Sequence, residues 1–516
     1  MFKGQPKGLI AAALANMGER FGFYIMMAIL TLFISSKFGL DETTTGYIYS
    51  VFYASIYLLA LVGGIIADKT GNYKSTIMWG LIVMAIGYVI ISIPTPTPVP
   101  NLPLYLTLTC VGLLVIAFGN GLFKGNLQAL VGQMYDKPEY ADKRETGFQI
   151  FYMFINIGGF FAPWIAIGVR NWWLRLNGFD YNAKLPELCH QYLGGAEMTA
   201  EGASNLVTYA NEVTLSGAQV TAEGLTQFCS TYLDVFNRGF HYAFAAAIVM
   251  MLVSLVIYLV NRSSFPDVQK KVASAVASKE DIAMSAQEIR QRILALFAVF
   301  GVVIFFWVSF HQNGYSLTYF ARDYVDLNVI NIDLGFTTIK GAEIFQCVNP
   351  FFVVFLTPVI MWLFGWLKQK KYEVSTPMKI ALGMGIAALA YLFLVFFSFA
   401  LPSKTELAGM SAAEAQGILV TPWVMIGLYF ILTVAELFIS PLGLAFVSKV
   451  APPHMQGLMQ GMWLAATAVG NSLLFVGGWL YTHTPMWVTW GVFVLACGAS
   501  MGVMLSMVKW LEKVTK

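Results

Sequence analysis

Long apolar runs, separated by short polar connections, make up most of the chain. Each run is about 20 residues long or longer, which is the length that an α-helix needs to cross a bilayer. Lipid offers no partners to backbone groups, so only helices and closed barrels span it, and barrel strands hold only about ten residues. We therefore predict twelve membrane-spanning helices, at residues 9–35, 45–67, 76–95, 104–126, 148–168, 239–261, 291–312, 341–367, 377–400, 421–446, 456–482 and 487–509.

Polar stretches divide these runs into two sets of six. Residues 262–290 are polar and charged, and we predict a cytoplasmic linker there, between an N-terminal six-helix bundle at 1–261 and a C-terminal bundle at 291–516. The stretch GGIIADKTGNYKS at 63–75 has a faint echo in FGWLKQKKYEVST at 364–376, the equivalent place in the second half. Paired six-helix halves are a transporter architecture with the substrate site between them, near the middle of the membrane.

Composition and charge agree with a membrane protein. The 516 residues are 58% hydrophobic and 11% charged, whereas soluble chains carry about a quarter charged residues. With both termini in the cytoplasm, most of the 31 lysines and arginines fall in the inner connections, which is the usual bias of membrane proteins. The net charge of +3 therefore reflects topology and gives no reason to expect a nucleic-acid partner.

The one long outer connection is predicted at 169–238 and holds two of the five cysteines. If it faces an oxidising compartment, Cys189 and Cys229 either form a disulfide or remain two unpaired thiols. The chain has no phosphate-cradling loop and no metal-binding spacing of His or Cys. We therefore predict a carrier without cofactors, driven by an ion gradient, rather than an enzyme or an ATP-driven pump.

Ionisable residues inside predicted spans are the strongest functional signal. Each costs several kcal/mol to bury unpaired, and such residues usually face the bundle interior or a wet cavity. Neighbouring residues lie about 100° apart on a helix, so we expect one of Glu19 and Arg20 to pair with Lys124 while the other faces a cavity. The set also includes Glu343, Glu436 and His311.

Two interpretations of these charges are open. A cavity with Arg20 and Lys124 on the first half and Glu436 on the second suits a zwitterion such as a peptide or an amino acid, because each half would hold one charged end. The alternative is a structural cluster that only locks helices together.

Several motifs give the chain a family resemblance. GERFGFY (18–24), GLFKGN (121–126), FYMFINIGG (151–159), FQCVNP (345–350) and ELFISPLGL (436–444) resemble signatures of the proton-dependent oligopeptide transporter (POT/PTR) family of the major facilitator superfamily. The resemblance implies an all-α membrane protein with the major facilitator fold, twelve transmembrane helices in two six-helix bundles. It also implies proton-coupled symport of di- and tripeptides by alternating access in a bacterial inner (plasma) membrane, with peptides, protons and the lipid bilayer as partners.

The resemblance also implies residue roles. Arg20 and Lys124 would face the peptide carboxylate and Glu436 the amino terminus. Glu19, Arg20 and Lys124 would form the proton-coupling cluster. The remaining substrate-binding residues would be Tyr24, Tyr57, Asn156, Trp307, Asn349 and Trp463.

Four positions depart from the family pattern. Asn16 replaces the first glutamate of the span-one signature, and Phe23 the first of its two tyrosines. Met27 and His311 replace an arginine and a glutamate that pair across the outer gate in the family, so we expect other contacts to hold this gate. We expect Glu19 to carry the proton, with His311 either a second titrating site or a neutral hydrogen-bonding residue. The alternative function is a major facilitator carrier of another small solute, with altered or absent proton coupling.

Overall fold

A computed structural model describes residues 4–135, 137–140, 143–266, 285–372, 374–452 and 455–514. Most of the predicted linker at 262–290 lies outside the described residues, since 267–284 are not among them. Among the described residues, twelve helical segments are long and apolar enough to cross a membrane, which confirms the predicted fold class. In the first half they are α1 (Lys7–Phe38), α2 (Glu42–Thr70), α3 (Tyr73–Ser92), α4 (Leu102–Met134), α5 (Arg144–Leu176) and α8 (Leu225–Val260).

Three of the six spans in the second half are broken. The seventh span consists of α10 (Ala286–Phe310), a 3-10 turn at His311–Gly314 and α11 (Ser316–Tyr324). The eighth begins with a 3-10 turn at Ala342–Cys347, and the eleventh changes helix between Ser472 and Phe475. The remaining segments are α12 (Val348–Gln369), α13 (Thr376–Ser398), α16 (Pro422–Val450), α17 (Gln456–Ser472), α18 (Phe475–His483) and α19 (Met486–Val514).

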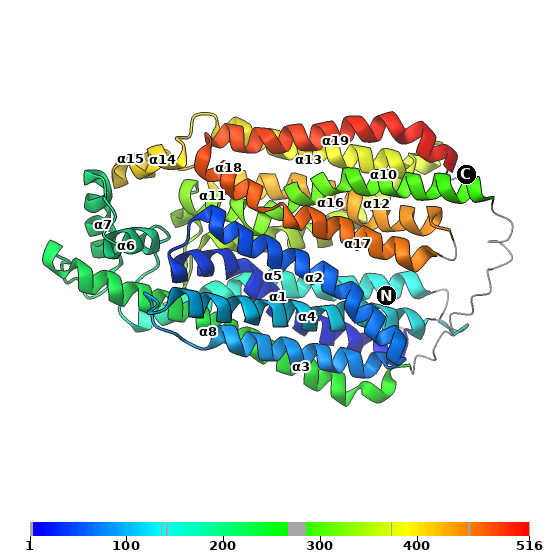
Figure 1. The fold of residues 1–516 in the computed structure, drawn as a ribbon, viewed down its shortest axis with the longest axis horizontal. Coiled ribbons are helices and arrows are strands. Elements are labelled where there is room, and N and C mark those ends of the chain that lie inside the picture. The colour runs from blue at the N-terminus through cyan, green and yellow to red at the C-terminus, as the bar shows by residue number, and fades with distance from the viewer. Residues whose placement is uncertain are drawn as a thin grey trace.

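The helices run side by side along the long axis of the molecule, with both chain ends at the same end (Figure 1). At the opposite end, here called the outer end, lie short helices of the connections between the spans. Two come from the first half and two from the second. They are α6 (Leu185–Leu193), α7 (Ala200–Val213), α14 (Lys404–Ala408) and α15 (Ala412–Gly417). A two-stranded ribbon, β1 (Ile332–Asp333) and β2 (Thr338–Ile339), follows α11.

Three spans extend further toward the outer end than their apolar runs predict. The fifth continues to Leu176, the sixth begins at Leu225 and the seventh reaches Tyr324. These extensions carry polar side chains that are nevertheless buried, such as Arg170 and Arg322, at 0% and 8% exposure. Protein partners rather than lipid surround them, so a hydropathy pattern does not detect them.

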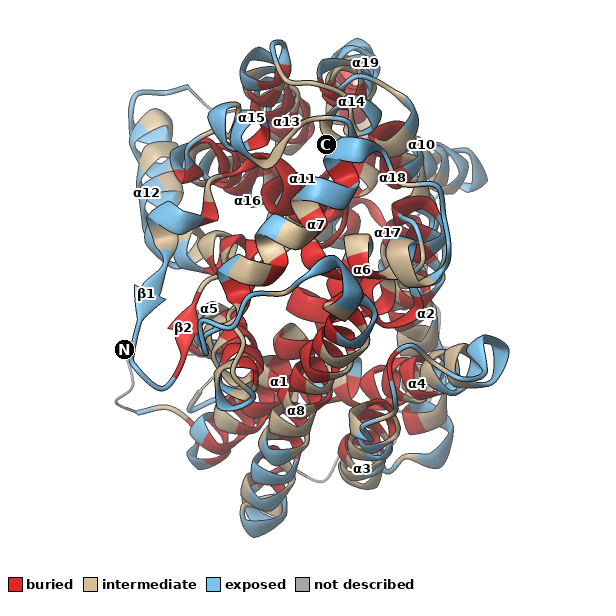
Figure 2. Ribbon diagram, turned by 90° about the vertical axis from the view of Figure 1, so that its left-hand side faces the viewer, coloured by how far each residue is buried: buried red, intermediate tan, exposed pale blue. Residues whose placement is uncertain are grey.

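Burial follows the expected division between lipid and protein interior. The apolar window of α1 is 83% buried, whereas that of α12 is 11% buried. Figure 2 shows buried residues concentrated on the inner sides of the helices and exposed ones on the periphery. Exposed aromatic residues such as Trp362 and Phe396 are what lipid-facing positions require. The first span is thus the centre of its half, and its charged residues lie inside protein.

Candidate functional site

The glutamate and arginine of GERFGFY pair with each other in the interior of α1. Arg20 Nε donates to Glu19 Oε2 at 2.5 Å, and Nη2 donates to Oε1 at 2.6 Å. Asn120 Nδ2 on α4 donates to the same carboxylate at 2.9 Å. Both residues are buried, Glu19 at 0% and Arg20 at 4% exposure. The expectation that one of them pairs with Lys124 was wrong, because the long arginine side chain folds back onto its neighbour.

Lys124 lies over the ring of Tyr57, with Nζ 5.2 Å from the ring centroid. The packing of α2 against α4 sets this position. A Cβ on Gly63 would lie 2.0 Å from the carbonyl oxygen of Gly121, so only glycines allow this approach. Asn126 Nδ2 donates to the carbonyl oxygen of Gly63 at 3.1 Å and joins the same two helices. Gly63 on α2 and Gly121 on α4 therefore allow the close packing that brings Lys124 and Tyr57 together.

A carboxylate–amide pair occupies the second half. Asn349 Nδ2, at the start of α12, donates to Glu436 Oε2 on α16 at 2.8 Å and to Thr433 Oγ1 at 3.0 Å. Thr433 in turn donates to the carbonyl oxygen of Tyr429 at 2.6 Å. The structure thus brings together two of the predicted substrate residues, Glu436 and Asn349.

Two tyrosines lie near charged residues of both halves. Tyr24 and Tyr57 are each within electrostatic range of Arg20 and of Glu436. Gly159 on α5 lies against Tyr24 and Pro350, since a Cβ there would be 3.2 Å and 3.0 Å from their side chains. Tyr24 therefore stands where the first half meets the segment that carries Asn349. A cationic group of one half and an anionic group of the other flank the same region.

An aromatic cluster surrounds His311 at the break in the seventh span. Its ring lies 4.9 Å from Trp307 and 4.6 Å from Tyr53, measured between ring centroids. His311 Nδ1 is 2.5 Å from Asn471 Oδ1, so a ring nitrogen is held by a neutral partner. Tyr53 was not predicted, although it lies one helical turn before Tyr57 on α2, and that spacing is the signal that would have found it.

Two other predicted residues have mainly structural contacts. Trp463 is 3% exposed and packs on Phe300, and a Cβ on Gly443 would lie 2.0 Å from its ring. Asn156 is half-buried, and its amide donates to the carbonyl oxygen of Tyr152 on the same helix at 3.0 Å.

Buried ion pairs join the two halves at the outer end, where sequence reasoning placed no pair. Arg170 on α5 pairs with Glu343, and both side chains are fully buried. Arg322 on α11 pairs with Glu42 at the start of α2 at 2.8 Å, and Lys404 pairs with the same carboxylate. These contacts meet the expectation that an outer gate with Met27 and His311 is held differently. Glu343 is part of this closure, not of the central charge set.

The outer end is closed by hydrogen bonds as well. Thr31 Oγ1 on α1 donates to the carbonyl oxygen of Gly314 at 3.2 Å, and Tyr319 Oη donates to the carbonyl oxygen of Thr31 at 3.1 Å. Gln346 Nε2 donates to the carbonyl oxygen of Ala28 at 3.2 Å. A side chain of the first half thus bonds a backbone carbonyl group at the break in the seventh span. The two halves are therefore in contact at the outer end.

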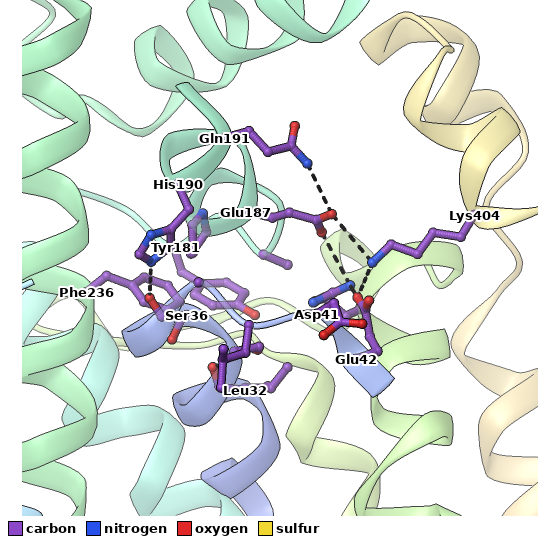
Figure 3. A pocket seen from close by; sticks show the side chains of 16 residues that line it. Leu32, Ser36, Asp41, Glu42, Tyr181, Glu187, His190, Gln191, Phe236 and Lys404 are labelled. Carbon is purple, nitrogen blue, oxygen red and sulfur yellow. Dashed lines mark hydrogen bonds and ion pairs between the residues drawn. The ribbon is translucent and has the colours of Figure 1, made fainter. Parts of the chain in front are cut away.

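A cavity of about 330 Å³ lies under α6 at this end, beside the ion pairs (Figure 3). Glu187 on α6 reaches across it to Lys404 and Arg322 at 3.5 and 3.7 Å. Burial alone lowers the pKa of Lys404, but Glu187 and Glu42 outweigh it and raise that pKa above its ordinary value. The ammonium group is therefore held charged. Among the described residues, no group of three or more His, Cys, Asp or Glu is placed to hold a metal ion.

Twelve spans in two halves, with opposite charges on either side of their boundary, define a secondary carrier of the major facilitator type. The sequence profile of the POT family matches residues 74–283 and 267–484. This is more than half of the chain, and the protein belongs to that family. The resemblance found in its motifs is confirmed.

The relatives and solved structures agree with this assignment. Peptide transporter YePEPT from Yersinia enterocolitica is 28% identical over 488 residues, covering 91% of this chain and 87% of the relative. Dipeptide and tripeptide permease B from Shigella dysenteriae is 27% identical over 530 residues, covering 99% and 96%. A crystal structure of a POT family transporter in complex with 5-aminolevulinic acid has a TM-score of 0.70 at 21% identity, covering 100% of this chain and 98% of that one. The matched relatives are transporters, not enzymes.

Proposed function

We propose that the protein imports di- and tripeptides together with protons, by alternating access across a bacterial inner membrane. The observation that carries this proposal is that Tyr24 and Tyr57 each lie within electrostatic range of both Arg20 and Glu436. A small zwitterion placed there would meet a cation of the first half and a carboxylate of the second. The peptide-transporting relatives support the same substrate class.

The peptide ends would each be held by one half. The substrate carboxylate would lie between Arg20 and Lys124, and the ammonium group would pair with Glu436. Asn349 already donates to Glu436 and would orient it, while Asn156 would hydrogen-bond the peptide backbone. Tyr24, Tyr57, Trp307 and Trp463 would shape the side-chain pockets. Because the ends are charged, binding couples occupancy to closure of the two halves on each other.

The proton would act through Glu19. In the outer-closed state this carboxylate accepts two bonds from Arg20, so the guanidinium is occupied. Protonating Glu19 would weaken that pair and free Arg20 for the substrate carboxylate. Asn120 would remain as a neutral partner for the protonated acid. Proton binding and peptide binding would thereby favour each other. His311, held by Asn471, would serve as a second proton site or as a neutral partner.

The orientation and the moving parts follow from the same proposal. Both chain ends lie at one end of the molecule, and the excess of lysine and arginine in the connections at that end supports a cytoplasmic location for it. Residues 1–261 and 291–516 would then be the two bodies that move against each other, joined by the linker at 262–290. The four short helices α6, α7, α14 and α15 would face the outside.

Reconstituted liposomes test the proposal. We expect wild-type protein to accumulate a labelled dipeptide when an inward proton gradient is imposed. Glu19→Gln is expected to keep peptide exchange between equal concentrations and to lose gradient-driven accumulation. Glu436→Gln is expected to lose both, because the ammonium partner is gone. The matched control is Glu288→Gln, an exposed glutamate at the start of α10 whose side chain is 44% exposed.

Two results would count against the proposal. Full accumulation by Glu19→Gln would remove Glu19 from proton coupling while leaving peptide binding intact. If neither a di-, a tri- nor a tetrapeptide raised the melting temperature of purified wild-type protein, the alternative carrier of another small solute would be favoured, since a ligand that binds the folded state raises apparent stability.

A further inference from the structure

The outer connection contains two cysteines whose side chains meet. Cys189 is on α6, and Cys229 is in the first turns of α8, on which α6 packs. The two side chains are within hydrogen-bonding contact of each other, and both residues have 0% exposure. They are 40 positions apart in sequence, so the fold and not the chain brings them together. In this structure both are free thiols.

The surroundings keep this contact dry and rigid. Tyr232, one turn after Cys229, stacks on Phe228 with ring centroids 5.6 Å apart, and its hydroxyl accepts from the backbone amide of Asn182 at 3.1 Å. The chain just before α6 is thereby attached to the outer part of α8.

The other three cysteines differ from this pair. Cys110, Cys347 and Cys497 lie one each in α4, the turn before α12 and α19. Cys497 donates to Ser309 Oγ at 3.3 Å. Only Cys189 and Cys229 face each other among the described cysteines, and only they belong to the outer connection.

Helix α6 also takes part in closing the outer gate. Its Glu187 reaches Lys404 and Arg322 of the second half, as Figure 3 shows for Lys404. Its His190 contacts the carbonyl oxygen of Ser36 on α1 at 2.6 Å. Helix α6 packs mainly on α8, so this attachment helps to keep Glu187 in reach of the second half.

We propose that Cys189 and Cys229 form a disulfide in the mature protein. This bond fixes α6 to the first half and keeps its Glu187 in position to close the outer gate. The two thiols lose two protons and two electrons, one S–S bond forms, and the electrons reduce the disulfide of a thiol–disulfide oxidoreductase to its dithiol. This proposal rests on the proposed orientation, because only an oxidising outer compartment supplies that partner.

The bond would act on one half only. Both cysteines belong to the first half, so the disulfide does not cross the boundary that must open during transport. It would hold Glu187 in place each time the halves close again. Reduction of the disulfide would therefore loosen the attachment of α6 to α8 without trapping a transport state.

Peptide mapping tests the bond in the full-length protein. Protein from membranes is denatured, alkylated without reductant, then digested. Trypsin alone leaves both cysteines within residues 185–238, because no lysine or arginine lies between them, so a glutamate-specific protease is added to separate them. We expect a cross-linked peptide pair containing Cys189 and Cys229, which reductant dissolves, and alkylated Cys110, Cys347 and Cys497. Recovery of Cys189 and Cys229 as alkylated thiols overturns the proposal.

Variants measure the consequence. Cys189→Ser and Cys229→Ser are each expected to lower the melting temperature by the same several degrees, and the double variant by no more, because all three remove one bond. Reductant should lower the wild-type value equally and leave the double variant unchanged. Cys110→Ser is the matched control and should respond to reductant as the wild type does. Additive effects of the two single variants would contradict a shared bond.

A separate reporter distinguishes this proposal from the proposed orientation. Ser216 is an exposed residue of the same outer connection. Ser216→Cys should react with a membrane-impermeant maleimide in spheroplasts. If it reacts while Cys189 and Cys229 are free thiols, the disulfide is wrong and the orientation stands. If it does not react from outside, the orientation is wrong and the disulfide falls with it.

Discussion

The buried pair between Arg170 and Glu343 offers a direct test of how the outer gate is held. Both side chains are fully buried, and they belong to different halves, on α5 and on the turn before α12. We consider Glu343→Gln, which keeps the shape of the side chain and removes its charge. Arg170 then keeps its hydrogen bonds to Asn171 Oδ1 at 3.0 Å and to the carbonyl oxygen of Lys340 at 3.2 Å, but no longer has an anionic partner.

The size of the effect follows from this burial. Removing one partner of a buried ion pair costs about 3–5 kcal/mol, because an uncompensated charge stays buried. When the outer side opens, the two residues separate and water reaches them, so the open state loses little. The whole cost therefore falls on the closed state. Since about 1.4 kcal/mol is a factor of ten, the closed-to-open ratio should fall by roughly a hundredfold or more.

A second pair between α5 and the second half gives the control. Arg175, five residues further along α5, pairs with Asp333 on β1 at 2.7 Å, but the Asp333 side chain is 57% exposed. An exposed pair contributes about 0–1 kcal/mol. Asp333→Asn should therefore change the closed-to-open ratio by less than about tenfold. The two variants remove the same charge from the same boundary and differ in burial.

Distances between spin labels provide the assay. Ser204 on α7 and Gln416 on α15 are exposed positions of the two halves at the outer end. Electron–electron double resonance between labels at these sites, in a Cys110→Ser background, should show a larger open population for Glu343→Gln than for the wild type. If Glu343→Gln and Asp333→Asn give the same distance distribution, the buried pair does not hold the gate and the reasoning is refuted.

Two further predictions concern packing and pH. Gly121→Ala should lower the free energy of unfolding by about 1–3 kcal/mol, since the new Cβ would lie 2.3 Å from the carbonyl oxygen of Leu59. Gly125→Ala is the control and should have almost no effect, because a Cβ there would have nothing within 4 Å. Equal losses of melting temperature in the two variants would contradict this prediction. Burial lowers the pKa of His190 below its ordinary value of 6.5, so the folded state binds fewer protons at this residue than the unfolded state does. The contribution of neutral His190 to stability is therefore complete above about pH 6.5 and is lost as the pH falls. Hydrogen-exchange protection of residues 185–193, corrected for intrinsic rates, should therefore drop on acidification in the wild type and less in His190→Gln; an unchanged pH dependence in that variant would exclude His190 as the cause.

The spans and the halves were predictable because their signal is local. A membrane helix must be apolar over about 20 residues whatever its neighbours are, so every predicted run became a span. The outer ends of the fifth, sixth and seventh spans were not predicted, because Arg170 and Arg322 are buried in part by residues that are distant in sequence. Hydropathy treats both arginines as exposed, whereas the tertiary structure brings Glu343 to Arg170 and Glu42 to Arg322.

The candidate site, too, was predictable from the sequence only in part. The charge inside a predicted span identified Glu436 and the family signature identified Asn349, and the structure joins these two residues by a hydrogen bond. The pairing of Glu19 with Arg20 was not predicted, because neighbouring residues point in different directions on a helix, and only the length of the arginine side chain lets it bond its neighbour. The contact between Cys189 and Cys229 depends on how α6 lies on α8, and no spacing rule contains that information.

Helix α7 meets α15 across the boundary between the halves through Asn205. Asn205 on α7 donates to the carbonyl oxygen of Met410 at 2.8 Å and accepts from the amide of Ala412 at 2.7 Å, just where α15 begins. This composite surface exists only while the two halves are in contact. An antibody fragment selected to bind α7 and α15 together would recognise one state of the transport cycle, and would arrest the carrier from outside without entering its substrate pathway.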